Sequence, residues 1–145
     1  MRNPSPYRRG WIRFRPTPYS KFRYSLRVHL VPTTVALRSY CPKWSKAIAV
    51  WKPNLRLRPG REPVIGAMLF SSEISTGVGL VAHECVHAAC TAFAVRTSGT
   101  PRGPSVYREE QMAGLVEDLT RSTVRLLYQM GCGIWPFPDK DKPHG

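Results

Sequence analysis

Two histidines and a glutamate form the group in this sequence best suited to chemistry. They occur in the run His83-Glu84-Cys85-Val86-His87. On a helix, residues i and i+4 lie on one face, so the two imidazoles can share one metal ion, for which zinc is the usual choice. Glu84 lies beside the first histidine, where its carboxylate can act as general base on a metal-bound water. The spacing therefore predicts a hydrolytic zinc site with His83 and His87 as ligands and Glu84 as the catalytic residue.

A catalytic zinc ion needs a third protein ligand and keeps its fourth position open for water. Only two other histidines occur, His29 in a predicted strand and His144 in a Pro-rich C-terminal tail. Two histidines and a glutamate are therefore a more consistent ligand set than three histidines. Glu109 and Glu110 open the next predicted helix.

Three strands are predicted before the motif. Phe22–Val31 alternates apolar and polar residues, which is typical of a half-buried strand. A second strand is predicted at Lys46–Trp51, stopped by Pro53, and a third at Val64–Ser72. The nearly continuous apolar character of the third strand indicates burial on both faces.

Two long helices are predicted after these strands. Ser75 and Thr76 are N-cap candidates for the first, which carries the motif and runs to about Val95. Its Cys85 is expected to pack in the core and not to bind metal. A loop rich in Gly, Pro and Ser leads to the second helix, at about residues 108–130, which ends at Gly131 and Gly133. Its apolar stripe consists of Met112, Leu115, Val116, Leu119, Leu126 and Leu127.

The motif and its surroundings resemble a known superfamily. Val81–Ala89, followed by Glu110-Gln111-Met112-Ala113, is similar to the gluzincin pattern, in which a glutamate on a following helix is the third ligand. The same residues are similar to the HExxH…ExxA pattern of ImmA/IrrE-type peptidases. They resemble small metallopeptidases encoded in bacteriophage genomes more closely. The resemblance covers about residues 60–128. It implies a compact zincin-like α+β domain, with a small twisted sheet of about three strands, an active-site helix and a second long helix.

The same resemblance assigns roles by position. His83, His87 and Glu110 would hold one Zn2+ per chain, and Glu84 would be the base. The family spacing places the ligand three residues before Ala113, which selects Glu110. Helical phase instead favours Glu109, which lies nearer the apolar stripe of its helix. Glu110 is the preferred third ligand and Glu109 the alternative.

Positive charge is concentrated in the first half of the chain. The net charge is +13, no Asp or Glu precedes Glu62, and 15 of the 22 Lys and Arg residues lie at or before Arg61. This imbalance favours anionic partners, either nucleic acid or an acidic protein surface. Aromatic residues are interleaved with the arginines, as in proteins that combine phosphate contacts with base stacking. The candidate nucleic-acid-binding residues are Arg8, Arg9, Arg13 and Arg15.

The 145 residues fit one folded domain. We expect a basic Pro- and aromatic-rich extended arm at 1–20, the catalytic domain at 21–134 and a Pro-rich tail at 135–145. No apolar run is long enough to span a bilayer, and the basic N-terminus does not resemble a signal peptide. A cytoplasmic protein is therefore expected, in the host cytoplasm if a phage encodes it.

The leading functional interpretation is a zinc metallopeptidase, a hydrolase acting on a peptide or protein substrate. The Val64–Ser72 strand would align the substrate by adding it to the sheet edge. One alternative is a nucleic-acid-associated basic protein, including a protease that acts on DNA-bound proteins. Another is an inactive zincin fold that serves as a structural or interaction module of a phage particle.

Overall fold

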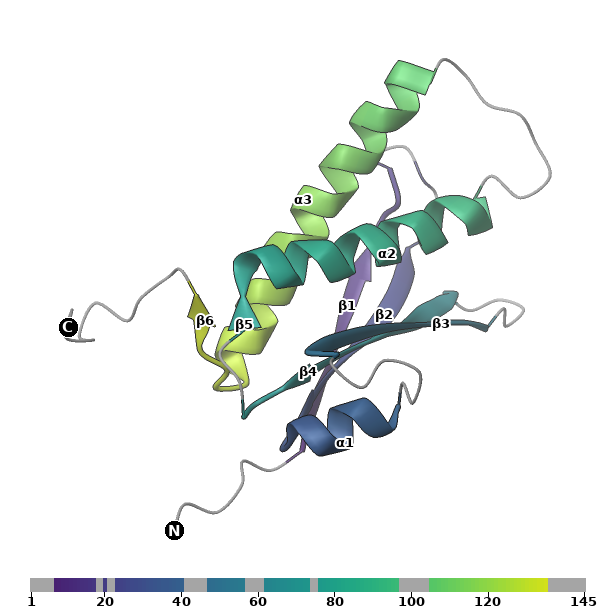
Figure 1. The fold of residues 1–145 in the computed structure, drawn as a ribbon. Coiled ribbons are helices and arrows are strands. Elements are labelled where there is room, and N and C mark those ends of the chain that lie inside the picture. Colours follow the sequence, from purple (N-terminus) through teal and green to yellow (C-terminus); the bar gives the residue numbers. More distant parts are fainter. Residues whose placement is uncertain are drawn as a thin grey trace, which may run out of the picture.

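The computed structural model describes residues 7–17, 20, 23–40, 47–56, 62–73, 76–96 and 105–135. Apart from Trp135, the predicted Pro-rich tail lies outside these residues, as does most of the loop before the second long helix. The elements, shown in Figure 1, are β1 (Arg8–Phe14), β2 (Tyr24–Val31), α1 (Thr34–Ser39), β3 (Ala49–Arg56), β4 (Val64–Ser71), β5 (Thr76–Gly77), α2 (Val78–Arg96), α3 (Ser105–Gln129) and β6 (Ile134–Trp135).

A mixed four-stranded sheet, in the order β1-β2-β4-β3, forms the centre of the fold. The β1–β2 and β3–β4 pairs are antiparallel, and the central pair, β2–β4, is parallel. Helices α2 and α3 cross each other over one face of the sheet, while the short helix α1 lies on the other side (Figure 1). This arrangement confirms the α+β class. The sheet has four strands, however, and not the three that the sequence predicts.

The additional strand, β1, comes from the segment expected to form an extended basic arm. Arg8–Phe14 pairs with Tyr24–Val31 along its whole length. Its pattern is that of a sheet-edge strand, with Ile12 buried and Trp11 and Arg13 exposed. Prolines flank this stretch but none lies within it, so every residue of β1 keeps its backbone donor. Part of the basic N-terminal segment is therefore built into the sheet.

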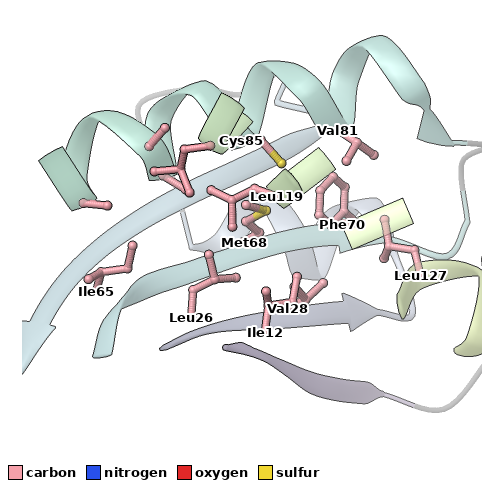
Figure 2. Close-up of a cluster of buried hydrophobic side chains, with 14 of the residues drawn as sticks. Ile12, Leu26, Val28, Ile65, Met68, Phe70, Val81, Cys85, Leu119 and Leu127 are labelled. Atoms are coloured by element: carbon pink, nitrogen blue, oxygen red, sulfur yellow. The ribbon is translucent and has the colours of Figure 1, made fainter. Parts of the chain in front are cut away.

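One apolar core joins the sheet to α2 and α3 (Figure 2). Leu26 and Phe70 from the central strands are fully buried, as are Leu119 and Leu127 from α3. The predicted stripe of α3 is confirmed, because its other four members also belong to this cluster or pack against it. Cys85 of α2 is fully buried as well, which confirms that it packs in the core.

The ends of the long helices follow local chemistry. Thr76 pairs with Ile134 in the small β5–β6 ladder, so it is not the N-cap of α2, and Ser75 lies outside the described residues. At the end of α3, Gly131 adopts a positive φ of 87°, and the N–H of Cys132 donates to the Leu127 carbonyl at 2.9 Å. This is the expected glycine-terminated helix end. In the described part of the chain, no helix is long and apolar enough to cross a bilayer.

The strand predicted at Lys46–Trp51 was expected to be stopped by Pro53, but the observed strand continues through this proline. Strand β3 runs from Ala49 to Arg56, and Pro53 lies opposite Gly66 of β4. The proline is tolerated because β3 is an edge strand, with one side unpaired, and because its register shifts between Pro53 and Arg56.

A substitution at Gly66 tests the close contact between β3 and β4. A Cβ at this position would overlap the Lys52 carbonyl oxygen and lie 2.8 Å from ring atoms of Trp51. We expect Gly66→Ala to lower the free energy of unfolding by about 1–3 kcal/mol, measured by chemical denaturation. Gly114→Ala is the matched control, since nothing lies within 4 Å of its added Cβ. The control should stabilise the exposed helix by about 0.5–1 kcal/mol. Equal effects of the two substitutions would contradict this packing.

Candidate functional site

The motif lies on α2, on the side of the helix that is turned away from the core. Val81, Cys85 and Ala88 face inward and are fully buried. His83 and His87 are exposed, and their Nε2 atoms are 3.3 Å apart. Their rings meet edge to face, with centroids 5.0 Å apart. The helix therefore brings the two predicted metal ligands together.

The separation of the two ring nitrogens can be compared with the geometry of a zinc site. Two nitrogens bound to zinc at about 2.0–2.1 Å, with a tetrahedral angle between them, lie roughly 3.3–3.4 Å apart. The observed 3.3 Å matches this value. The same distance also suits a hydrogen bond between a protonated and an unprotonated ring nitrogen. The separation of the His83 and His87 nitrogens is thus suitable for two corners of a tetrahedral site.

Glu84 lies on the boundary between the histidine face and the core face of α2. It is only 4% exposed, yet it lines the same cleft as the two histidines. Within the described residues, no group donates a hydrogen bond to its carboxylate. Burial raises the pKa of Glu84, and the neighbouring His87 and His83 counteract part of this increase. A buried carboxylate without a donor is unfavourable unless something in the cleft interacts with it.

The opposite wall of the cleft is strand β3. The cleft has a volume of about 850 Å³. Its lining residues are Ala47, Ile48, Ala49, Val50, Trp51, Gly79, Leu80, His83, Glu84 and His87.

Trp51 fixes β3 against α2. Its indole N–H donates to the Thr91 hydroxyl at 3.1 Å, and this hydroxyl donates to the His87 carbonyl oxygen at 3.1 Å. The strand is thereby attached to the helix one turn beyond the second histidine. Sequence reasoning missed Trp51 and Thr91 as residues that shape the site. The one local signal was Pro53, since a proline inside a strand pattern indicates a sheet edge.

The strand expected to align a substrate was wrongly identified. Val64–Ser71 is β4, which pairs with β2 on one side and β3 on the other. Its backbone groups are therefore already used, and no peptide can add to it. The exposed edge beside the histidines belongs to β3. The apolar run of β4 reflects burial on both faces, as the sequence indicated, and the pairing of β4 with β2 and β3 excludes an edge position.

The two candidates for the third ligand do not lie with the histidine pair. Glu110 lines a second cleft together with Arg13, Arg15 and Gln111, near β1 at the other edge of the sheet. Glu109 is exposed, in helical phase with Met112 and Val116, which pack against the core. Among the described residues, no group of three or more His, Cys, Asp or Glu side chains could hold a metal ion.

The packing of α3 explains why Glu110 does not lie with the histidine pair. Leu115, Leu119 and Thr123 lie on one face of α3 and are fully or almost fully buried. Thr123 Oγ1 lies 3.7 Å from Cys85 Sγ, which is on the core face of α2 and not on its histidine face. This contact sets the rotation of α3, and Glu110 consequently projects toward β1.

The four arginines proposed for nucleic-acid binding have different surroundings. Arg8 donates from Nη1 to the Met130 carbonyl oxygen at 2.8 Å, so it binds the C-terminal end of α3. Arg13 pairs with Glu62, whose Oε2 accepts from its Nε at 3.0 Å. Arg15 lines the cleft at Glu110. Arg9 lies opposite His29 in the β1–β2 ladder.

No family model matches the chain, and no curated protein or solved structure matches it significantly. Any functional conclusion therefore depends on the geometry of this chain alone.

Proposed function

We propose that this protein is a zinc-dependent hydrolase of peptide bonds, with His83 and His87 as zinc ligands and Glu84 as general base. The observation that supports it most directly is the cleft itself. Two imidazole nitrogens lie at zinc-ligand spacing beside a buried carboxylate that has no donor among the described residues. The buried carboxylate of Glu84 is the unusual feature, because Glu is rarely buried without a partner. Together the three residues match the needs of metal-assisted hydrolysis.

The roles of the side chains follow from their positions. When bound, zinc supplies Lewis acidity, polarising a carbonyl group and lowering the pKa of water. Glu84 takes up the proton that the attacking water loses, and it delivers that proton to the leaving amine. Burial favours its protonated form and so keeps the carboxyl group basic enough to accept a proton. His83 and His87 fix the position of the ion relative to this carboxylate.

A peptide in extended conformation would bind along the unpaired edge of β3. Ala47–Trp51 forms the wall of the cleft opposite the histidines. An added strand there would form main-chain hydrogen bonds with β3, which are independent of substrate sequence. Its scissile bond would then face the side chains of α2. The alternative of an inactive zincin-like fold requires the same cleft without hydrolysis, so activity measurements distinguish the two.

Zinc binding is the first prediction of this proposal. Protein dialysed against zinc and then against buffer should contain about one zinc ion per chain by elemental analysis. His83→Ala and His87→Ala should each lower the zinc content to near zero, because each removes one ligand. His29→Asn is the matched control, a histidine on the opposite face of the sheet, and should retain the ion. Absence of zinc from the wild-type protein would refute the proposal and leave a simple hydrogen bond between the rings.

Replacement of the base separates binding from chemistry. Glu84→Gln should keep its zinc, because this side chain does not coordinate the ion, but should lose about 100-fold or more in hydrolysis rate. The assay is cleavage of a proteome-derived peptide library by the zinc-loaded protein, detected by mass spectrometry. A variant that loses zinc as fully as His83→Ala would show that Glu84 is a ligand. Absence of cleavage by the wild-type protein would favour the inactive fold.

The third ligand can be identified by a matched pair of substitutions. Neither glutamate lies with the histidines, but Glu110 lines the cleft near β1, so we propose Glu109 as the third ligand. Glu109 shares the helical phase of Met112 and Val116, on the side of α3 that faces the core. Glu109→Ala should weaken zinc affinity about 10-fold or more, and Glu110→Ala should change it little, as measured by competition with a chromogenic chelator. The opposite result would restore Glu110 as the ligand.

A further inference from the structure

The sheet has a second exposed surface, on the side away from α2 and α3, which we call the open face. Cross-strand register places Trp11, Arg27, Ala67 and Lys52 side by side in one row across all four strands. Helix α1 covers only one end of this side, where Leu37 packs with Val31, Val50 and Leu69. The row through Trp11 is left accessible.

A cleft of about 530 Å³ is centred on this row. Ala67 lies in the middle of the row and contributes only a methyl group. The cleft is therefore deepest there, between the larger side chains on either side. The residues that line the cleft are Tyr7, Trp11, Arg27, His29, Tyr40, Lys52, Pro53, Asn54, Glu62, Val64, Gly66, Ala67 and Leu69.

Three aromatic side chains border this cleft and remain largely exposed. Tyr7, Trp11 and Tyr40 are 46%, 49% and 45% exposed. Exposed aromatic rings gathered around one cleft indicate a binding surface more often than a chance arrangement. Two of the rings already hold cations against their faces: Arg27 lies 4.5 Å from the centroid of the Trp11 ring, and Lys52 lies 5.6 Å from that of Tyr40.

The charge of the open face is strongly positive. Arg27 and Lys52 line the cleft, and Arg9 and Arg13 extend the same side along β1. The acid in the lining, Glu62, is paired with Arg13. The pKa of His29 is lowered, mainly by burial and then by the positive charges of Arg27 and Arg9. An anionic ligand would reduce the repulsion among these cations.

We propose that the open face binds single-stranded nucleic acid. An unpaired base would lie over Ala67 and stack on Trp11 or Tyr40, while Arg27 and Lys52 contact the adjoining phosphates. Aromatic platforms interleaved with cations are how sequence-tolerant single-strand sites are built. A duplex presents phosphates but keeps its base faces stacked, so it would satisfy the cations and leave the aromatic rings unused.

This site is separate from the histidine cleft. Strand β3 contributes to both, with Trp51 on the side of α2 and its neighbour Lys52 on the open face, because successive side chains of a strand alternate. The two activities can therefore be lost independently, and the nucleic-acid proposal does not depend on the metal.

The test uses full-length protein and a fluorescein-labelled single-stranded oligodeoxythymidine of about twelve nucleotides, with anisotropy measured over a range of salt concentrations. Trp11→Ala should weaken binding about 5- to 100-fold, and Trp11→Phe should restore most of it, because a stacking surface returns. Lys52→Ala should make the decrease of binding affinity with salt concentration less steep, by about the amount expected for one lost phosphate contact. Deletion of residues 1–20 is unsuitable, because it removes β1 and with it part of the fold.

Matched controls come from α3, on the other side of the sheet. Tyr128→Ala removes a ring that is 75% exposed, and Arg125→Ala removes an exposed cation. Neither should change oligonucleotide binding more than about twofold, and His83→Ala should bind like wild type. The proposal is overturned if the wild-type protein fails to bind the oligonucleotide at about 50 mM salt. It is also overturned if the controls weaken binding as much as Trp11→Ala, or if duplex DNA binds as tightly as the single strand.

Discussion

The attachment of strand β3 to helix α2 through Trp51 determines the shape of this molecule around its candidate site. The indole N–H bonds to Thr91 on the helix, and the ring passes over Gly66, where a side chain would collide with it. Strand β3 is also held by its ladder with β4 and by the packing of Val50 against Leu37 of α1, and neither of these joins it to the histidine face of α2. With the Trp51 contact, the edge strand and the histidine face of α2 become two walls of one cleft. The geometry of the candidate site therefore depends on a tryptophan and a glycine that have no proposed chemical role.

The same strand relates the two surfaces proposed to function. Because side chains alternate along β3, Trp51 turns toward the helices and Lys52 toward the open face. A register slip of one residue would exchange them, placing a lysine in the apolar core and a tryptophan on the open face. The close approach at Gly66 opposes such a slip, since only a residue without Cβ fits between the Lys52 carbonyl and the Trp51 ring. One constraint thus fixes both sites.

Patterns confined to one element were predictable from sequence, and relations between elements were not. The alternation in β2 and the helical repeat in α3 each record burial along a single segment, and the i, i+4 spacing of His83 and His87 records one shared face of a helix. The structure confirms all three. Strand β1 was missed because arginine on an exposed strand face looks like an unstructured basic run. Helix α1 was missed because six residues are too few to show a repeat. The position of β4 at the sheet centre depends on strand order, which no local pattern carries.

The proposed third ligand illustrates the limit of predicting a site from sequence spacing alone. The distance in sequence from His87 to Glu110 says which helix carries the carboxylate, but the rotation of that helix is a tertiary property. Here the contact of Thr123 with Cys85 and the burial of Leu119 set the rotation, and both depend on residues more than one turn away from Glu110. Because helix position and rotation are fixed by the most deeply buried contacts, an exposed residue of the second turn follows the core and not the motif. The proposal of Glu109 in place of Glu110 therefore rests on the packing of α3 on α2.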